Sequence, residues 1–192
     1  MNLIRNLFAL VGLVVVLGLG AFYFGNRDRI AQFDPQAGEV YLDFARKVLE
    51  TGNGAEASVW KMPVEEGLSA EDVEETMKFV ANEHNISNVG ELPLSKDVAA
   101  KLGKPYRFVK IYMFCNSLTA RQMLDYSDAF SAYLPCRITM IEDKTGRLWL
   151  YTLNMDLMIY GGRPLPKELK EEAINVKEVI LDIMKRGAAG DF

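Results

Sequence analysis

At the centre of the chain stand two apolar segments, Val109-Lys-Ile-Tyr-Met-Phe-Cys115-Asn116 and Tyr133-Leu-Pro-Cys136-Arg-Ile-Thr-Met140. The first predicts a strand that ends at Cys115, and the second predicts a strand that opens at Cys136. Between them we expect a helix that Ser117 or Thr119 caps and Pro135 ends. This spacing is enough to bring both thiols, the only two in the protein, to one region.

The segments on either side predict further strands and helices. Arg137–Glu142 and Arg147–Leu153 alternate around Asp143-Lys-Thr-Gly146, which is typical of a hairpin. The other expected elements are strands at Ser58–Val64 and Asn85–Leu92, and helices from Asp34, from Ser69, at Ser95–Leu102 and at Lys167–Arg186. We expect Gly161-Gly162 to end a strand, and residues 187–192 to be unstructured unless Phe192 docks. This order predicts an α+β fold in which helices cover one face of a sheet.

The N-terminal residues predict a membrane anchor. Leu7–Phe24 is an unbroken apolar run, and as a helix it would span roughly 27 Å, close to the thickness of a bilayer core. A cleaved signal peptide with a mature start near Ala21 is the alternative, but Gly18-Leu19-Gly20 matches a cleavage site poorly. Arg5 precedes the run and Arg27 and Arg29 follow it, so charge barely decides the orientation. We expect a single-pass protein of the bacterial inner membrane with its soluble domain in the periplasm.

Three regions follow from these patterns: residues 1–29 as the anchor with its flanks, 30–56 as a connector with an amphipathic helix, and 57–192 as the α+β domain. The apolar content of 49% and the charged content of 25% are those of an ordinary globular protein. The formal charge is −4. An acidic domain lacks the positive surface that phosphate backbones require, so nucleic acid is excluded as an expected partner.

Four groups of residues carry a resemblance to a known bacterial family. They are Phe114-Cys115-Asn116, Leu134-Pro-Cys136-Arg-Ile138, Ile141-Glu-Asp143 with Gly146, and Asn154-Met-Asp156 with Ile159-Tyr-Gly-Gly162. On these residues, the segment from about Val59 to Phe192 resembles the family called domain of unknown function 302. The resemblance implies a fold like that of the TATA-box-binding protein, a curved antiparallel sheet with helices on one face, and it implies no activity. Many members have Gly-Asn-Pro and Leu-Pro-aliphatic at the two cysteine positions, so this chain resembles a cysteine-bearing, membrane-anchored subgroup.

The cysteines admit three interpretations. Thiol-redox or sulfur-handling chemistry would need an exposed thiolate of lowered pKa, for which Arg137 could supply positive charge, but Cys-x-x-Cys is absent. A soft-metal site for Cu(I) would combine Cys115 and Cys136 with a methionine, either Met113, Met140, Met155 or Met158. The third interpretation is structural, as a disulfide or two buried thiols. His84, the only histidine, is expected to be a solvated residue at a helix end.

A second group of polar residues, Asn116, Arg137, Asn154 and Asp156, could line a small-ligand pocket with Tyr151 and Tyr160, or could simply form turns. We therefore expect a membrane-anchored binding or accessory domain that takes a small ligand or a protein partner, with thiol or sulfur chemistry as the alternative. Expected contacts are the lipid bilayer through residues 7–24 and a membrane protein or a second copy of the chain. No cofactor is expected, and whether the protein is an enzyme stays open.

Overall fold

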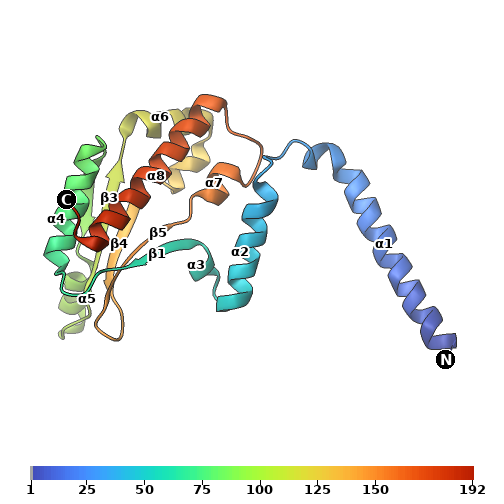
Figure 1. Ribbon diagram of the computed structural model, residues 1–192, viewed down its shortest axis with the longest axis horizontal. Coiled ribbons are helices and arrows are strands. Elements are labelled where there is room, and N and C mark those ends of the chain that lie inside the picture. Colours follow the sequence, from blue (N-terminus) through green and yellow to red (C-terminus); the bar gives the residue numbers. More distant parts are fainter. Residues whose placement is uncertain (1) are drawn as a thin grey trace.

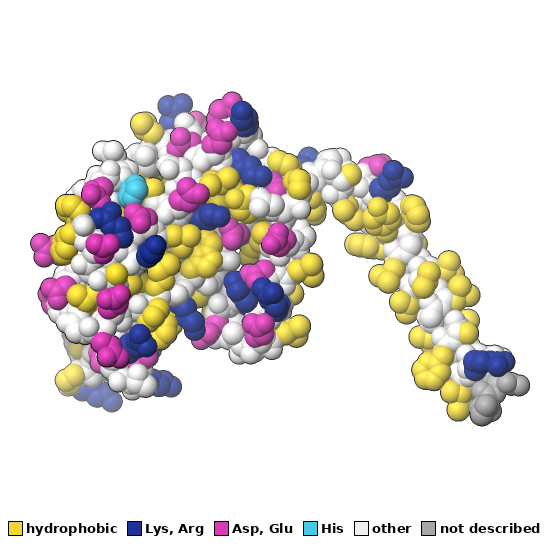
Figure 2. Space-filling view, in the orientation of Figure 1, with side chains coloured by type: hydrophobic (Ala, Val, Ile, Leu, Met, Phe, Trp, Pro, Cys, Tyr) yellow, Lys and Arg dark blue, Asp and Glu magenta, His cyan; other side chains and the backbone are white. Residues whose placement is uncertain are grey.

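The computed structural model describes residues 2–192, with side chains from Ile4 onward. The first element, helix α1 (Asn2–Ile30), projects away from the rest of the chain (Figure 1). Apolar side chains run along its length (Figure 2), and none of its apolar window is buried. The helix is long and apolar enough to cross a membrane, a property that it shares with signal sequences.

A short connector joins α1 to helix α2 (Ala37–Thr51), which is followed by the single turn α3 (Gly54–Ala57). The N-cap of α2 is Gln36, whose own side chain makes no cap, and Asp34 stands two residues before it. One oxygen of the Asp34 carboxylate accepts from the Gln36 amide at 3.0 Å, and the other forms an ion pair with Lys170 of α8. Only 3% of Asp34 is exposed, and an unpaired buried charge would cost several kcal/mol, so the pair with Lys170 is what permits its burial.

Five strands form one antiparallel sheet in the order β1-β5-β4-β3-β2. The strands are β1 (Val59–Pro63), β2 (Ser87–Leu92), β3 (Val109–Cys115), β4 (Cys136–Glu142) and β5 (Leu148–Leu153). This confirms the predicted α+β fold and its single antiparallel sheet. Strands β4 and β5 form the expected hairpin, in which the Asp143 carboxylate accepts hydrogen bonds from the amides of Thr145 and Arg147, and Gly146 has a φ of +89°.

Two long helices, α4 (Ala70–Glu83) and α8 (Lys167–Ala189), lie against one face of the sheet (Figure 1). A capping box between Ser69 and Asp72 starts α4, with Asp in place of the usual Glu. The core lies between these helices and the sheet, and its largest fully buried side chains are Tyr112, Phe114, Met77, Ile138, Met140, Leu150, Ile159, Ile180, Ile183 and Met184. The apolar residues that alternate along the strands and those that recur at helical spacing therefore pack into one core.

At the C-terminus, α8 runs further than expected, and of the two expectations for residues 187–192 it is the docking of Phe192 that the structure shows. The helix continues to Ala189, and Gly190 ends it with a φ of +67°. Beyond it, the ring of Phe192 packs edge-on against Phe79, with centroids 5.6 Å apart. The glycines and alanines after Arg186 suggested a break in the helix, but here their small size permits close packing against α4.

The remaining helices are α5 (Leu94–Leu102), α6 (Ser117–Tyr126), the 3-10 turn η1 (Asp128–Ala132) and α7 (Asp156–Tyr160). The expected single helix after β3 is therefore two, because Ser127 has extended backbone and its hydroxyl accepts from the amide of Ala129. Gly161 and Gly162 follow α7 rather than a strand, which corrects that expectation. The carbonyl of Gly161 accepts from the Tyr41 hydroxyl, and the carbonyl of Gly162 accepts from the Asp34 amide, so both glycines join α2 and the connector to the domain.

Candidate functional site

A cavity lies at the end of the sheet where β3 stops and β4 starts. Strand residues Phe114, Cys136 and Leu153 form one wall, α6 and η1 form another, and Ala173, Val176 and Ile180 of α8 close it. The space open to water-sized molecules is about 50 Å³. One water needs roughly 10–15 Å³ on this measure, so the cavity has room for a ligand of a few heavy atoms.

Both cysteines line this cavity, as their positions at the strand ends suggested. The Cα atoms of Phe114 and Cys136 are register partners, so Cys115 lies one position beyond Cys136 on the neighbouring strand. Both thiols are free, and each is half-buried. Residues offset by one register position point to opposite faces of a sheet, which is unfavourable for a disulfide although the two strands are adjacent.

The electrostatics of the two thiols favour the protonated form. Burial raises the pKa of Cys136 to about 11, with Cys115 adding to the rise and Arg137 opposing it weakly. Burial also raises the pKa of Cys115. An activated thiolate requires a lowered pKa. The positive charge of Arg137, which the sequence suggested as the cause of such a lowering, does not overcome the effect of burial.

Three of the predicted polar residues lie at the cavity: Asn116, Arg137 and Asn154. The side-chain Oδ1 of Asn116 caps α6, accepting from the backbone amides of Leu118 and Thr119, so Asn116 rather than Ser117 or Thr119 is the N-cap. The side-chain Oδ1 of Asn154 accepts from the backbone amide of Asp156. Both asparagines thus shape turns and also form part of the cavity rim.

The other predicted polar residues do not line the cavity. Asp156 forms an ion pair with Lys177 at 3.0 Å. The ammonium groups of Lys170 and Lys177 lie over the Tyr160 ring. Their Nζ atoms are 4.9 Å and 5.3 Å from the ring centroid, respectively. Tyr151 is a register partner of Lys61 and Thr139 in the middle of the sheet. Tyr151, Asp156 and Tyr160 are therefore near Asn154 in sequence but do not line the same cavity.

Of the four methionines that the sequence suggested as metal ligands, two line the cavity and two do not. Met155 and Met158 line the cavity, and so does Met123 of α6, which the sequence interpretation did not include. Met140 is buried in the core, and Met113 lies against Gly90, where an added Cβ would be 2.8 Å from its Cε. Within residues 2–192 no group of three or more His, Cys, Asp or Glu side chains is placed to hold a metal ion.

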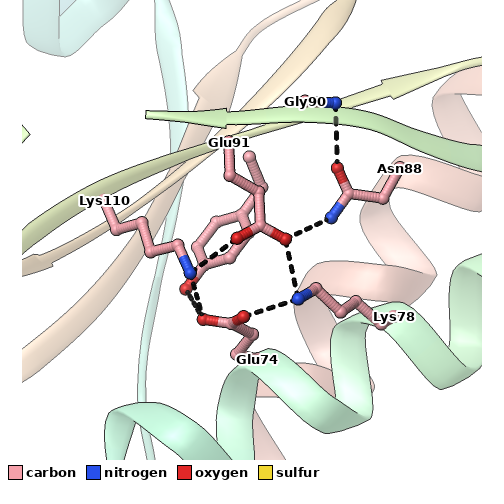
Figure 3. Close-up of polar contacts among 7 residues, drawn as sticks. Glu74, Lys78, Asn88, Gly90, Glu91 and Lys110 are labelled. Carbon is pink, nitrogen blue, oxygen red and sulfur yellow. Dashed lines mark hydrogen bonds and ion pairs between the residues drawn. The ribbon is translucent and has the colours of Figure 1, made fainter. Parts of the chain in front are cut away.

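A second polar cluster lies between α4, β2 and β3 (Figure 3). The Lys110 ammonium is 2.6 Å from Glu74 and 2.7 Å from Glu91, and the Lys78 ammonium is 2.5 Å and 2.7 Å from the same two carboxylates. The Tyr112 hydroxyl donates to Glu74 at 2.8 Å. This charge network was missed because its members are far apart in sequence and none belongs to a recognisable motif.

The charge network is internally satisfied. Burial by itself would raise the pKa of Glu74, but the hydrogen bonds from Lys110, Lys78 and Tyr112 outweigh it and hold the pKa at about 2. Burial raises the pKa of Tyr112 well above its usual range, and the hydrogen bond to Glu74 is the second cause of this rise. Two carboxylates and two ammonium groups leave no net charge for a ligand to neutralise, so the network is a structural element. His84 is the exposed C-cap residue of α4, as expected, and its Nε2 lies 2.8 Å from the carboxylate of Asp182 on α8.

The fold and cavity define a small α+β domain, one antiparallel sheet covered by two long helices, that follows an apolar N-terminal helix. The family model described as "Domain of unknown function DUF302" matches residues 60–186, and the chain belongs to this family. The chain is similar to the crystal structure of an uncharacterized conserved DUF302 protein from Bacillus stearothermophilus, with a TM-score of 0.55 and 14% identity over 67% of this chain and 96% of that chain. No curated protein matches the chain significantly. The predicted family is thereby confirmed.

Proposed function

We propose that this protein is a membrane-anchored accessory domain that binds a small ligand in the cavity at the junction of β3 and β4. The observation that carries the proposal is the composition of that cavity, whose walls are apolar and whose rim holds Asn116, Arg137 and Asn154. Binding sites for small molecules have this character, with apolar walls and a few polar groups that orient the ligand.

The arrangement favours a ligand with an apolar body and a polar or anionic end. Arg137 is exposed and supplies the positive charge at the rim, while the Met and Phe side chains inside offer no charged partner. A space of about 50 Å³ limits the buried part to a few heavy atoms. A nucleotide or a haem would be too large for this space.

Methyl NMR of the full chain in detergent micelles, with ¹³C-labelled methionine methyl groups, tests the proposal. The probe is n-butanol, which has an apolar body and a polar end. Saturable shifts are expected for Met123, Met155 and Met158, which line the cavity, and not for Met77 or Met184, which lie in the core away from it. Equal shifts at all methionines, or none, would contradict binding in the cavity.

A matched pair of variants on α6 sharpens this test. Ala120 lines the cavity, so Ala120→Leu fills it with three additional carbon atoms and is expected to abolish the butanol shifts. Gln122 is exposed on the same helix, and Gln122→Leu is expected to leave them unchanged. Leucine is a good helix former at both positions, so a difference between the variants reports the cavity rather than the helix.

The proposal includes α1 as an uncleaved anchor, with the domain in the periplasm. The support is the length and apolar character of α1. Protease treatment of spheroplasts tests it. The expected outcome is a membrane-bound protein whose domain is digested from outside. A soluble mature chain beginning near Ala21, or a domain protected from the protease, would overturn this part.

The alternative, thiol–disulfide or sulfur chemistry at Cys115 and Cys136, receives no support from the electrostatics of the site. The pKa of both thiols is raised by burial, so the thiolate that would attack a disulfide is scarce at neutral pH. We therefore favour binding over thiol catalysis.

A further inference from the structure

We infer that the ligand of this cavity is a short-chain monocarboxylate, whose alkyl chain fills the cavity and whose carboxylate is held at the rim by Arg137, Asn116 and Asn154. This inference rests on the proposed function, since it names the ligand class of the same cavity. Four observations carry it: the charge of the lining, the positions of the three residues, their free hydrogen-bond donors, and the size of the interior.

The charge that lines the cavity is single and positive. Among residues 4–192, Arg137 is the only charged side chain in its walls or rim. The nearby carboxylates are engaged elsewhere, since Asp156 pairs with Lys177 and Glu172 accepts from the hydroxyl of Thr119. One positive charge matches a ligand with one negative charge, so the site suits a carboxylate better than a phosphate group or a dicarboxylate.

The three rim residues stand in a row at one edge of the sheet. Asn116 follows the last residue of β3, Asn154 follows the last residue of β5, and Arg137 is the second residue of β4, the strand between them. The hydroxyl of Thr152 on β5 donates to the carbonyl of Arg137 at 2.7 Å, so β5 lies beside this end of β4. Adjacent strands are about 4.8 Å apart, which places the backbones of the two asparagines about 10 Å from each other. One carboxylate fits between side chains that converge from these positions.

Each asparagine offers a free donor. The Oδ1 atoms are occupied, because that of Asn116 accepts from two amides of α6 and that of Asn154 accepts from the amide of Asp156. Within residues 4–192 neither Nδ2 atom donates to a protein acceptor, and no buried side-chain nitrogen lacks one, so both Nδ2 atoms are accessible. An amide NH₂ group only donates, so the two asparagines select a hydrogen-bond acceptor.

The guanidinium of Arg137 completes the set of donors. It forms no ion pair or hydrogen bond with the part of the chain whose side chains are described, and the residue is exposed. Arg137 and Cys136 leave β4 on opposite faces, but the cavity lies at the end of the strand, where a long and flexible side chain can reach its rim. The positive charge of Arg137 opposes the rise in the pKa of Cys136 that burial causes, so this charge acts on the cavity wall. A guanidinium binds a carboxylate through two parallel hydrogen bonds.

The interior fits a short alkyl chain. Behind the rim the walls are apolar, with Phe114, Met123 and Ile180 among them, and methionine adapts to the shape of an apolar ligand. A space of about 50 Å³ holds a chain of about three or four carbon atoms once the carboxylate stays at the rim. This size favours a free short-chain acid over a long-chain fatty acid released from the bilayer.

Methyl NMR of the ¹³C-methionine-labelled full chain in detergent micelles tests the inference with three four-carbon probes. Butyrate ends in an anion, n-butanol in a neutral group and n-butylamine in a cation. Butyrate should shift Met123, Met155 and Met158 with a Kd at least about 10-fold lower than that of n-butanol, because hydrogen bonds to a charged group are stronger than those to a neutral one. The Kd of n-butylamine should be higher than that of n-butanol. Equal Kd values for butyrate and n-butanol, or a lower one for n-butylamine, would overturn the inference.

A series of acetate, butyrate and octanoate, compared at their free concentrations, separates the two sources of a carboxylate. Butyrate should bind more tightly than acetate because it buries more apolar surface. Octanoate should bind at least about 10-fold more weakly than butyrate, since its chain exceeds the space and overpacking a filled cavity is costly. Tighter binding of octanoate would assign the cavity to fatty acids of the membrane and would overturn the short-chain assignment.

A charge-neutralising pair of variants tests the role of Arg137. Arg137→Gln should weaken butyrate binding by at least about 10-fold and change n-butanol binding by less than about 2-fold, because only butyrate carries the charge that the guanidinium binds. Arg147→Gln removes the same charge from the exposed hairpin turn at the other end of β4, and it should leave butyrate binding unchanged. Equal effects of the two variants on butyrate, or an equal loss of both probes in Arg137→Gln, would contradict the role of this arginine.

A second pair of variants tests the asparagine donors. Asn116→Asp replaces an NH₂ donor by a negative charge and keeps the helix cap, since Asp and Asn are equally good N-caps. It should weaken butyrate binding by at least about 10-fold and strengthen the binding of n-butylamine. Asn53→Asp makes the same change at the N-cap of α3, away from the cavity, and should leave both affinities unchanged. Unaltered butyrate binding in Asn116→Asp would overturn the assigned role of Asn116.

The n-butanol probe distinguishes the two levels of the proposal. If n-butanol shifts the methionines of the cavity and butyrate binds no more tightly, only the carboxylate inference fails. If neither probe shifts those methyl groups, the cavity does not bind ligands and the proposed function fails with it.

Discussion

Gly187 of α8 lies directly against Met77 of α4, so closely that a Cβ on the glycine would be 2.5 Å from the methionine Cγ. Met77 is fully buried, and both residues lie where the two long helices cross over the sheet. The glycine is therefore required for the approach of the helices and not for any unusual backbone conformation.

Gly187→Ala is expected to destabilise the protein by about 1 kcal/mol. The helix gains about 0.5–1 kcal/mol from replacing glycine, but overpacking a filled core costs about 1–3 kcal/mol. The free energy of unfolding in urea measures the difference. Gly38→Ala in α2 is the control, since nothing lies within 4 Å of its Cβ position, and it should be neutral or stabilising. Equal effects at both glycines would show that the close contact does not limit packing.

Glu74→Gln should cost about 1–3 kcal/mol at neutral pH, because it leaves Lys78 and Lys110 sharing one carboxylate, that of Glu91. The pKa of Glu74 is lowered from 4.5 to about 2 on folding, so its contribution is complete above pH 4.5 and is lost as the pH falls through about 2. The difference between wild type and variant should shrink over that window.

Urea unfolding at a series of pH values measures this difference. Glu75→Gln is the matched control, because Glu75 is exposed on the same helix, and its effect should stay within about 0.5 kcal/mol. A difference between wild type and Glu74→Gln that does not change between pH 4.5 and pH 2 would contradict the assigned role of the charge network.

Alkylation by iodoacetamide should be slow at Cys136. A pKa raised from 9.0 to about 11 reduces the thiolate fraction near neutral pH by about 100-fold, and the reaction requires the thiolate. Mass spectrometry of each cysteine peptide over time gives the rates, with Lys144→Cys at the exposed hairpin turn as a reference thiol. Cys115 should react faster than Cys136 and more slowly than the reference. A Cys136 that reacts as fast as the reference would revive the thiol-chemistry alternative.

Asp34→Asn should loosen the connector. The carboxylate is buried and pairs with Lys170, and burial alone would raise its pKa, but the hydrogen bonds from Lys170 and from the Gln36 amide lower it. Losing the pair should cost about 1–3 kcal/mol locally and increase hydrogen exchange both in α2 and in α7, which α2 contacts. Asp43→Asn, which breaks ion pairs that lie along α2 itself, is the control and should leave the exchange at α7 unchanged. Equal exchange in wild type and Asp34→Asn would show that the ion pair does not hold the connector.

Local patterns in the sequence were sufficient for most of the fold. Strand alternation, the helical spacing of apolar residues and the hairpin turn that contains Gly146 marked most elements to within a few residues. Local patterns do not show partners that are distant in sequence. Asp34 lies at the start of the α2 region, as its neighbours indicate, and accepts from the Gln36 amide, but only the folded chain shows that its carboxylate also pairs with Lys170 on the last helix.

For the candidate site, the sequence indicated the two cysteines, Asn116 and Arg137, because strand ends and turn residues are recognisable from local patterns. It could not show that Asp156 and Tyr160 pair with Lys177 instead, nor that Met123 belongs to the cavity. Each of these facts depends on how α6, α7 and α8 pack on the sheet.

The apolar run of α1, the strands and the family membership were thus determined by the sequence alone, since each depends on residues that are neighbours along the chain or on matching motifs. The charge network of Glu74 and the sulfur-lined cavity were decided only by the tertiary structure. The physical reason is that burial and pairing act between surfaces, and two surfaces meet only when the whole sheet and its helices are assembled.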